Sequence, residues 1–401
     1  LDLGHAPTLA RIDAQRAPFE TSKWTAGPLL AGTAKPADSI DLNNPADPTD
    51  HIGAVQYASL ADVQTAVSKA KPWKASVAQR AKVMNKAADL FEDNFGELFA
   101  LLTREAGKTL MDCVAELREA VDFLRYYAAQ ATDDAPAGTA LCISPWNFPL
   151  AIYAGQISAA LASGNAVLAK PAEQTSLMGY RAAQLMHEAG VPKSALQFLP
   201  GAGDIGAALT AQPNLNIVAF TGSTGTALRI RASLAENAPA TPLIAETGGL
   251  NAMIVDSTGL PEQAVAAIVE SAFQSAGQRC SALRCLYVQE DIAPEFIKML
   301  TGAMDALEVG APWHLPTDVG PVIDETARVK IAAHIEAHSR DVIHAIGTPE
   351  TGTFIAPTLI KVTGIKAMKE EIFGPVLHLA TYKSSDLDKV IDDINATGYG
   401  L

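Results

Sequence analysis

The chain of 401 residues lacks a long hydrophobic run and is short of positive charge. A membrane-spanning helix takes roughly 20 consecutive apolar residues, whereas the most apolar stretch, 141–168, is interrupted by proline, asparagine and glutamine. We therefore expect no transmembrane segment. The 30 basic and 44 acidic side chains give a formal net charge of -14, which repels phosphate backbones and anionic lipid. This charge argues against nucleic acid or a membrane surface as a partner.

Cysteine is scarce, and the chain opens without a targeting signal. The four cysteines, Cys113, Cys142, Cys280 and Cys285, are too few for a disulfide framework at this length and suit a reducing compartment. The first residues form neither the basic segment nor the apolar core of a signal peptide, and there is no initiating Met. We expect a cytoplasmic protein, or part of a longer one.

The remaining composition is that of a globular protein, with 48% hydrophobic and 18% charged residues. Residues 1–59 have little sustained periodicity and predict an arm or linker, or a mobile tail. Helical periodicity follows, and after residue 136 short apolar runs alternate with helical segments, which predicts a mostly parallel sheet with helices on both faces. The periodic segments are 60–67, 78–106 and 110–131; the predicted strands are 140–143, 166–169, 197–199 and 217–220, with helices at 151–162, 177–189 and 205–211.

A second series of alternating elements begins after residue 250 and predicts a second α/β unit. Residues 397–401 resemble a turn directly after a helix that ends near residue 395. Because a glycine pair after a helix normally leads into a further strand, we expect a C-terminal piece to be absent. The predicted strands of this unit are 252–255, 285–288 and 376–382, and its predicted helices are 261–276, 293–307 and 325–338.

Cys280 follows a predicted helix at a glycine turn, in the sequence GQRC (277–280). A nearby cation such as Arg279 favours the thiolate, which is the nucleophilic form of cysteine. The alternative is a small buried hydrophobic residue, which is the commoner role of a single cysteine and our prediction for Cys285.

Two loops that follow predicted strands carry side chains suited to carbonyl chemistry. Glu246, in ETGG (246–249), can act as a general base if burial raises its pKa, with a solvated glutamate as the alternative. Asn147 lies between two prolines in SPWNFP (144–149), so a rigid loop can present its amide to an oxyanion. The alternative for this loop is packing alone.

Two further loops have features of a dinucleotide site. In FTGST (220–224) glycine and hydroxyl residues precede a predicted helix, whose N-terminal N–H groups and dipole favour phosphate, although the GxGxxG spacing is missing. In KPAEQT (170–175), Lys170 and Glu173 are placed to hold ribose hydroxyls. The carboxylate would also repel a 2′-phosphate, which favours NAD over NADP.

Taken together and in order, six motifs resemble the aldehyde dehydrogenase superfamily from about residue 40 to the end: SPWNFP, KPAEQT, FTGST, ETGG, GQRC and EEIFGPV (370–376). Longer segments are similar to the L-glutamate-γ-semialdehyde (Δ1-pyrroline-5-carboxylate) dehydrogenase domain of bifunctional proline utilization A proteins. Those segments are 104–110, 116–128, 243–257 and 275–284.

This resemblance implies an α/β fold with two domains after the N-terminal arm at 1–59. A Rossmann-like NAD-binding domain would occupy 60–248, with the remnant of an oligomerisation hairpin at 129–140. An α/β catalytic domain of the aldehyde dehydrogenase fold would occupy 249–401, with its C-terminal part absent.

The resemblance also implies roles for individual residues. Cys280 would be the nucleophile, Glu246 the base for the hydrolytic water, and Asn147 the oxyanion donor beside the backbone N–H of Cys280. The implied reaction is the NAD-dependent oxidation of L-glutamate γ-semialdehyde to L-glutamate, the second step of proline catabolism, through a thiohemiacetal and a thioester on the cysteine. The implied cofactor-binding residues are Ile143, Trp146, Lys170, Glu173, Gly222, Ser223, Glu371 and Phe373, and the implied substrate-binding residues are Glu119, Phe148, Arg279 and Ser281; no metal is implied.

Members of this family are usually homo-oligomers, and the parent chain of such a domain would also carry a proline dehydrogenase domain. The C-terminal part that we expect to be absent supplies the family's loop for the substrate carboxylate and its subunit-joining strand. Three alternatives to the implied function stay open. These are a dehydrogenase for another small acidic aldehyde such as succinate semialdehyde, an inactive truncated NAD-binding module, and a cysteine hydrolase. Glu246 argues against coenzyme-A-acylating relatives, which dispense with this base.

Two other patterns are interpreted as structural. Gly107-Lys108-Thr109 resembles the end of a nucleoside-triphosphate loop, but Leu102 stands where that loop needs its first glycine. His334 and His338 lie four residues apart on a predicted helix and could share a metal, but no third ligand is near in sequence. We expect these two histidines on a solvated helix surface.

Overall fold

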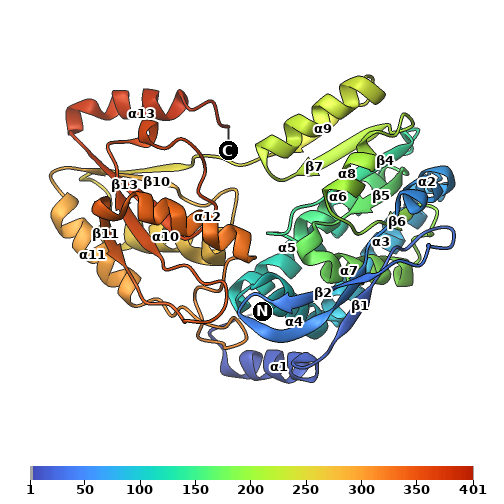
Figure 1. Ribbon diagram of the computed structural model, residues 1–401, viewed down its shortest axis with the longest axis horizontal. Coiled ribbons are helices and arrows are strands. Elements are labelled where there is room, and N and C mark those ends of the chain that lie inside the picture. The colour runs from blue at the N-terminus through green and yellow to red at the C-terminus, as the bar shows by residue number, and fades with distance from the viewer. Residues whose placement is uncertain (1–2, 401) are drawn as a thin grey trace. The chain divides into compact units, whose positions relative to one another are not determined.

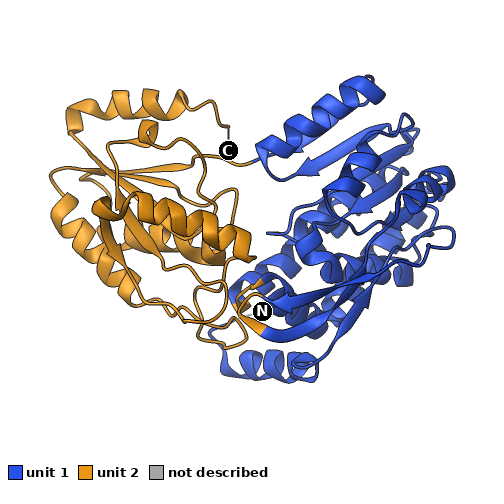
Figure 2. Cartoon of the chain, viewed as in Figure 1, with its two compact units in different colours: residues 1–44, 49–106, 111–247 blue, residues 45–48, 107–110, 248–401 orange. Residues whose placement is uncertain are grey.

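The computed structural model describes residues 3–400 and consists of two compact units (Figure 1, Figure 2). Leu1, Asp2 and Leu401, at the outer ends of the predicted arm and of the predicted second domain, lie outside the described residues. Unit 1 comprises the residues up to Asn44, Thr49–Ala106 and Met111–Thr247, and unit 2 comprises Pro45–Pro48, Gly107–Leu110 and the residues from Gly248 onward.

A five-stranded parallel sheet organises unit 1, in the order β6-β5-β4-β7-β8. Central strands β4 and β5 are near-continuous apolar runs because both of their faces are covered. The predicted parallel α/β sheet is confirmed. The strands are β4 (Thr139–Ile143), β5 (Ala166–Lys170), β6 (Leu196–Phe198), β7 (Ile217–Thr221) and β8 (Leu243–Glu246).

Helices connect these strands and cover the sheet. Apolar side chains of α2, α8 and α9 share one core with β4, β5 and β7, while α3 packs on α6 and α7. The helices of this unit include α2 (Leu60–Lys69), α3 (Val77–Asp93), α4 (Phe95–Ala106), α5 (Leu110–Gln130), α6 (Ala151–Ala162), α7 (Ser176–Ala189), α8 (Gly203–Thr210) and α9 (Thr224–Asn237).

The helix predicted over 78–106 is wrong in one respect, because the structure has two helices there. Helix α3 ends at Asp93, and Asn94 leaves the helical conformation with φ -100° and ψ 19°. The Asn94 side-chain amide donates to the Leu90 carbonyl at 2.8 Å and satisfies one acceptor of the final turn. Asparagine competes for backbone hydrogen bonds in this way, which favours helix ends.

The region predicted as an arm contains regular structure that its periodicity did not show. Helix α1 (Ala6–Arg16) packs on α4, and a separate sheet has the order β1-β3-β2. Strand β1 lies so close to Gly53 of β3 that a Cβ there would lie 2.1 Å from the Trp24 carbonyl oxygen. The strands are β1 (Trp24–Ala26), β2 (Ser39–Asn44) and β3 (Asp47–Gln56).

Unit 2 contains a second five-stranded sheet, in the order β11-β12-β13-β10-β9. All of its pairs are parallel except β11 with β12. The three predicted strands are confirmed as β9 (Ala252–Val255), β10 (Cys285–Gln289) and β13 (Val376–Tyr382), whereas β11 (Val342–Ala345) and β12 (Thr358–Lys361) were not predicted. The helices are α10 (Pro261–Phe273), α11 (Ala293–Asp305), α12 (Glu325–Ala337) and α13 (Leu387–Asn395).

Within residues 3–400, every helix is too short or too polar to cross a bilayer. The segment 129–140, predicted to be a hairpin remnant, comprises the end of α5, a connection without helix or strand, and the start of β4.

Candidate active site

The carboxyl edge of the unit 1 sheet carries candidate site residues at the ends of four strands and in the loops after them. The chain runs from β4 outward through β5 to β6, and then returns to place β7 on the other side of β4. Ligands of open parallel sheets bind beyond the carboxyl ends of strands at such a reversal of strand order. Asn147 and Gly222 lie in the loops that follow β4 and β7, and Lys170 and Glu246 are the last residues of β5 and β8.

The Asn147 loop is fixed to both neighbouring strands. The Ser144 hydroxyl donates to Oε1 of Gln156 at 2.9 Å, and Nε2 of Gln156 donates to the Thr221 hydroxyl at 3.0 Å. Asn147 is 7% exposed, and the Ser144 N–H donates to the Lys170 carbonyl. The loop is therefore a supported turn in which the backbone around Asn147 is held on two sides.

A buried carboxylate supports the far end of the same loop. Glu116 lies on α5, and its Oε2 accepts hydrogen bonds from the N–H groups of Ala151 at 2.8 Å and Leu150 at 3.3 Å. These are groups at the N-terminus of α6, where negative charge is favourable. Our sequence reasoning singled out neither Glu116 nor Gln156; the polar Gln156 inside an otherwise apolar helix was the available signal.

The side chains in and near this loop to which the resemblance assigns a binding role differ in burial. Ile143, the last residue of β4, is buried, whereas Trp146 and Phe148 are half-buried. Glu119, one helical turn from the buried Glu116, is half-buried on α5. All four side chains belong to unit 1.

Lys170 and Glu173 form a polar group at the end of β5. Nζ of Lys170 donates to the Pro171 carbonyl at 3.0 Å and lies 3.9 Å from Oε2 of Glu173. Burial lowers the pKa of Lys170, against the opposing charges of Glu173 and Asp204. Burial and the same two carboxylates raise the pKa of Tyr57. Asp204 and Tyr57 therefore belong to this group, and sequence reasoning missed them because they come from other segments.

The Gly222–Ser223 turn begins helix α9. The Ser223 hydroxyl accepts a hydrogen bond from the Thr226 N–H at 3.2 Å and caps the helix. Gly222 donates its N–H to the Glu246 carbonyl at 3.1 Å, so this group extends the β7–β8 pairing. The turn 223–225 is exposed, which leaves the N-terminus of α9 accessible to an anion.

Glu246 ends the edge strand β8, and its side chain is exposed. The burial that would qualify it as a general base is therefore not present in this structure, and its catalytic role stays a prediction.

In unit 2, Cys280 follows a tight turn with unusual backbone geometry. Ser275, Ala276 and Gly277 have φ angles of 54°, 52° and 65°. Left-handed conformations cost roughly 1–3 kcal/mol at non-glycine residues and concentrate at functional sites. The Asn251 side-chain amide donates to the carbonyls of Cys280 at 2.7 Å and Ala282 at 2.9 Å, which holds the segment after the turn.

Cys280 differs from the other cysteines in its exposure. Cys280 is half-buried, whereas Cys113, Cys142 and Cys285 are buried, so the prediction of a buried Cys285 is confirmed. Burial raises the pKa of the Cys142 and Cys285 thiols to about 12. Neither of these two thiols forms the nucleophilic thiolate near neutral pH.

The side chains on either side of Cys280 differ in their surroundings. Arg279 donates from one terminal nitrogen to the Glu270 carbonyl of α10 at 3.0 Å, and its Nε is buried without a hydrogen-bond partner among the described residues. Ser281 is exposed. Their predicted contacts with substrate stay predictions.

Glu371 and Phe373 lie against a buried arginine that sequence reasoning missed. A terminal guanidinium nitrogen of Arg284 donates to Oε1 of Glu371 at 2.9 Å, and the guanidinium carbon lies 5.2 Å from the centre of the Phe373 ring. Burial raises the pKa of Glu371, although Arg284 and the Gly249 N–H oppose this shift. A Cβ at Gly248 would lie 1.9 Å from Oε2 of Glu371, so a larger residue there would displace the carboxylate.

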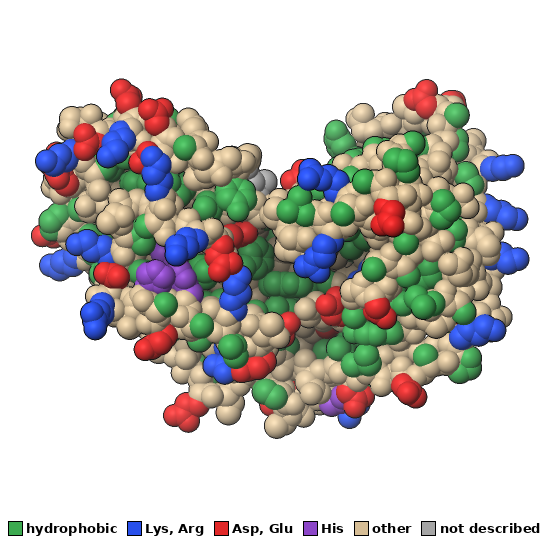
Figure 3. All heavy atoms as spheres, turned by 45° about the horizontal axis from the view of Figure 1, so that its top comes forward, with side chains coloured by type: hydrophobic (Ala, Val, Ile, Leu, Met, Phe, Trp, Pro, Cys, Tyr) green, Lys and Arg blue, Asp and Glu red, His purple; other side chains and the backbone are tan. Residues whose placement is uncertain are grey.

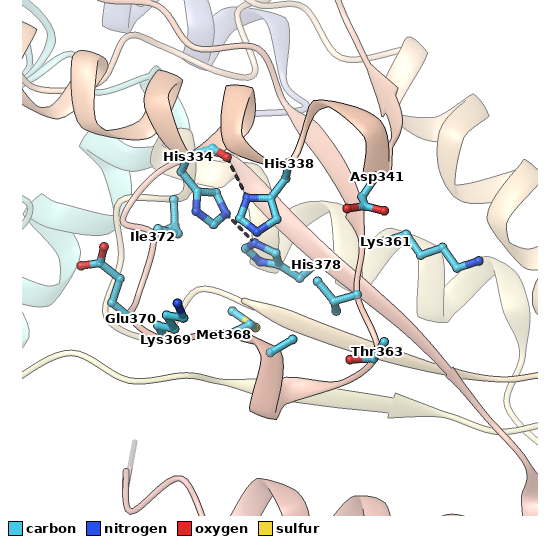
Figure 4. Close-up of a pocket in the computed structure, with 12 residues that line it drawn as sticks. His334, His338, Asp341, Lys361, Thr363, Met368, Lys369, Glu370, Ile372 and His378 are labelled. Atoms are coloured by element: carbon cyan, nitrogen blue, oxygen red, sulfur yellow. Dashed lines mark hydrogen bonds between the residues drawn. The ribbon is translucent and has the colours of Figure 1, made fainter.

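A histidine cluster in unit 2 corrects one prediction. His334 and His338 do not lie on a solvated helix surface: both are half-buried and line a pocket of about 510 Å³ together with His378 (Figure 4). Figure 3 shows histidine side chains, in purple, gathered on one surface. His378 is far from the other two histidines in the sequence and was therefore not predicted to join them. Strand β13 brings it close, so that its Nε2 lies 2.9 Å from Nε2 of His334.

Backbone carbonyls determine the tautomers of this cluster. Nδ1 of His378 bonds to the Arg284 carbonyl and Nδ1 of His338 to the His334 carbonyl, so both Nδ1 atoms carry the proton. His334 then donates from Nε2 to His378. Burial lowers the pKa of His378 to about 4 and also lowers that of His334. Among residues 3–400, no group of three or more His, Cys, Asp or Glu side chains is arranged to hold a metal ion.

Comparison with known proteins gives consistent matches along the chain. The family model described as "Aldehyde dehydrogenase family" matches residues 33–401. The bifunctional protein PutA of Salmonella typhimurium is 47% identical over 427 residues, which cover 100% of this chain and 32% of PutA, so the chain spans about a third of that relative. The 1-pyrroline-5-carboxylate dehydrogenase of Anoxybacillus flavithermus is 36% identical, over 93% of this chain and 79% of the relative.

A solved structure agrees with these sequence matches. The structure of 1-pyrroline-5-carboxylate dehydrogenase from Thermus with bound NAD superposes with a TM-score of 0.90 at 29% identity, covering 97% of this chain and 82% of that one. The predicted α/β fold of the aldehyde dehydrogenase type is thereby confirmed.

Proposed function

Because the chain belongs to the aldehyde dehydrogenase family, we propose that it oxidises L-glutamate γ-semialdehyde to L-glutamate with NAD. The observation that carries this proposal is the 36% identity to a 1-pyrroline-5-carboxylate dehydrogenase of which the chain covers 79%. The half-buried Cys280 after its left-handed turn supports the same reaction, since cysteine is the nucleophile that the chemistry needs.

The described residues fit NAD in both units. In unit 1, Lys170 and Glu173 would hold the adenosine ribose, and the exposed N-terminus of α9 would receive the pyrophosphate. In unit 2, Glu371 would hold the nicotinamide ribose, with Phe373 beside the nicotinamide. When bound, NAD supplies the hydride acceptor for the oxidation.

In the proposed first step, the Cys280 thiolate adds to the aldehyde carbon. A C–S bond forms, and the carbonyl electron pair moves to oxygen. The Asn147 amide and the Cys280 backbone N–H donate hydrogen bonds to this oxyanion, and each such donor contributes roughly 3 kcal/mol in comparable sites. This step requires the Asn147 amide and the Cys280 thiol to reach the same carbonyl group.

Loss of the hydride leaves a thioester on Cys280, which must then be hydrolysed. Glu246 would take a proton from water as the water oxygen attacks the thioester carbon, and the C–S bond breaks to release the acid and restore the thiolate. This step needs Glu246 as a carboxylate.

The match to about a third of PutA, 32% of its length, suggests a wider context. We propose that the chain is the dehydrogenase part of a bifunctional protein that also carries a proline dehydrogenase domain. Because the nucleophile must remain a reduced thiol, we also propose a reducing compartment such as the cytoplasm.

The test compares NADH formation from glutamate semialdehyde by the wild type and by Cys280→Ala. Cys142→Ala is the matched control, because Cys142 is buried in strand β4. We expect the Cys280 variant to lose activity by at least a thousandfold and the control to retain it. Faster turnover of succinate semialdehyde than of glutamate semialdehyde would contradict the substrate assignment, and equal rates for wild type and Cys280→Ala would contradict the nucleophile.

A further inference from the structure

Arg284 is a fully buried cation four residues after Cys280, with a side chain 0% exposed. A buried charge is costly unless its hydrogen bonds are made. Arg284 makes them to two different loops of unit 2, and neither the sequence motifs nor the proposed chemistry uses it.

One set of these bonds goes to the loop that carries the nucleophile. Nη1 of Arg284 donates to the Gly277 carbonyl at 2.7 Å, and Nη2 donates to the Arg279 carbonyl at 2.9 Å. The first carbonyl ends the left-handed turn, and the second immediately precedes Cys280. Strained backbone of this kind persists only when its surroundings hold it.

The other set goes to the loop 371–374. Nη2 and Nε of Arg284 donate to Oε1 of Glu371 at 2.9 and 3.3 Å, and Nη1 donates to the Gly374 carbonyl at 3.3 Å. The guanidinium also lies over the Phe373 ring, at 5.2 Å from its centre. A single planar group thus connects the two loops.

The backbone of Arg284 is itself held by the histidine cluster. Both the N–H and the ring Nδ1 of His378 bond to the Arg284 carbonyl, at 3.0 and 3.1 Å. The position of the guanidinium is therefore determined from its backbone as well as from its four acceptors.

We propose that Arg284 is a positioning residue that holds the Cys280 loop against the loop 371–374 and presents the Glu371 carboxylate to the nicotinamide ribose. This inference rests on the proposed function, because it uses the NAD role of Glu371. Arginine is required since its five N–H donors form a rigid fork, whereas lysine offers three from one nitrogen and cannot serve acceptors in two loops together.

The cation also acts on the nucleophile through its charge. Arg284 and Cys280 interact electrostatically, and a nearby positive charge favours the thiolate. Arg284→Lys retains a charge but loses the fork, so it separates the positioning effect from the charge effect. Arg284→Met removes both.

The test is a double-mutant cycle on NAD binding, measured by calorimetry with Arg284→Lys, Glu371→Gln and the double variant. If Arg284 acts through Glu371, Arg284→Lys weakens NAD binding by at least tenfold in the wild-type background and by less than threefold in the Glu371→Gln background. Equal losses in both backgrounds, or unchanged binding by a folded Arg284→Lys protein, would overturn the proposal.

A matched control addresses the cost of changing any buried arginine. Arg104 is 3% exposed, binds both Asp50 oxygens and two backbone carbonyls, and lies over Trp24. Arg104→Lys should lower thermal stability and leave NAD binding within twofold. An equal loss of NAD binding in this control would overturn the positioning role.

Two further measurements keep the proposal falsifiable. If Arg284→Lys does not fold, Glu371→Asp withdraws the carboxylate from Arg284 while keeping its charge, and unchanged NAD binding by this variant would overturn the proposal.

The second measurement is the alkylation of Cys280 by iodoacetamide, followed by peptide mass spectrometry at a series of pH values. The pH at which alkylation is half-maximal should be higher in Arg284→Met than in the wild type. An unchanged midpoint would contradict the charge effect. Neither binding nor alkylation needs turnover, so a wild type without dehydrogenase activity would refute the proposed function separately.

Discussion

The side-chain amide nitrogen of Asn251 lies 2.7 Å from the carbonyl oxygen of Cys280. The same amide reaches the Ala282 carbonyl at 2.9 Å, so one side chain holds the backbone on both sides of Ser281. The orientation of the nucleophile in unit 2 therefore depends on a residue 29 positions earlier in the chain.

Asn251→Ala should reduce kcat by about tenfold, because two part-buried hydrogen bonds worth about 1 kcal/mol each are lost and the Cys280 backbone gains freedom. NAD binding should change by less than twofold, because the Asn251 side chain bonds to the Cys280 and Ala282 carbonyls, whereas Glu371 is held by Arg284. Steady-state kinetics and calorimetry measure the two effects. Asn237→Ala, which removes an exposed side chain that bonds only to the Ser233 carbonyl in α9, is the control. An unchanged kcat for Asn251→Ala would contradict this role.

Gly248→Ala should weaken NAD binding by at least tenfold. The new Cβ would lie 1.9 Å from Oε2 of Glu371 and must displace the carboxylate from its present position. Gly302→Ala is the matched control, since a Cβ there meets nothing within 4 Å inside helix α11, and it should stabilise the fold by about 0.5–1 kcal/mol. NAD affinity equal to that of the wild type in Gly248→Ala would show that the Glu371 position does not matter.

Gln156→Leu should lower kcat more than it changes the KM for NAD. Leucine has a similar volume but cannot bond to Ser144 and Thr221, so the loop that carries Asn147 loses its connection to β7. We expect a loss of about tenfold in kcat. Gln212→Leu, which removes a side-chain bond to the Ala208 carbonyl in α8, should leave kcat unchanged. Equal kcat values for both variants would remove the supporting role of Gln156.

Stability should fall with decreasing pH because of His378. Its pKa is lowered by burial from 6.5 to about 4, so below pH 6.5 the unfolded chain binds a proton that the folded chain does not. The resulting loss in the free energy of unfolding is absent above pH 6.5 and complete below about pH 4, where it reaches about 3 kcal/mol.

Urea unfolding of the wild type and His378→Asn at pH 7.5 and pH 5 measures this effect. The wild type should lose more free energy of unfolding between the two pH values than the variant does. His5→Asn, a change at an exposed histidine of α1's N-terminus, should behave as the wild type. An equal loss in the free energy of unfolding by the wild type and by His378→Asn would contradict the role of His378 in this pH dependence.

The sequence allowed prediction of those parts of the fold in which burial is continuous. Strands β4 and β5 are buried along nearly their whole length and are therefore short apolar runs bounded by turns. Strand β2 is mostly exposed and polar, and strand β3 begins with three exposed residues and is interrupted by Gly53, so their pairing is not visible as a period. Strand β11 contains His344, and strand β12 begins at Thr358 and ends at Lys361, so neither is an uninterrupted apolar run like β9.

The site was predictable where a residue belongs to a local motif, and not where its role comes from a distant contact. Cys280 and Asn147 each lie in a short loop after a helix or strand, and Glu246 ends a short strand. Arg284 meets Glu371 across 87 residues of sequence. Such contacts are set by strand order, here by the parallel pairing of β10 with β13, which no local pattern encodes.

The central claim is that the carbonyl substrate becomes covalently attached to Cys280 during oxidation. Mixing Glu246→Gln with NAD and glutamate semialdehyde should release one equivalent of NADH per chain and then stop, because hydrolysis lacks its base. Peptide mass spectrometry should find the acyl group on Cys280. An absence of the NADH burst, or an acyl group on any other residue, would contradict the account.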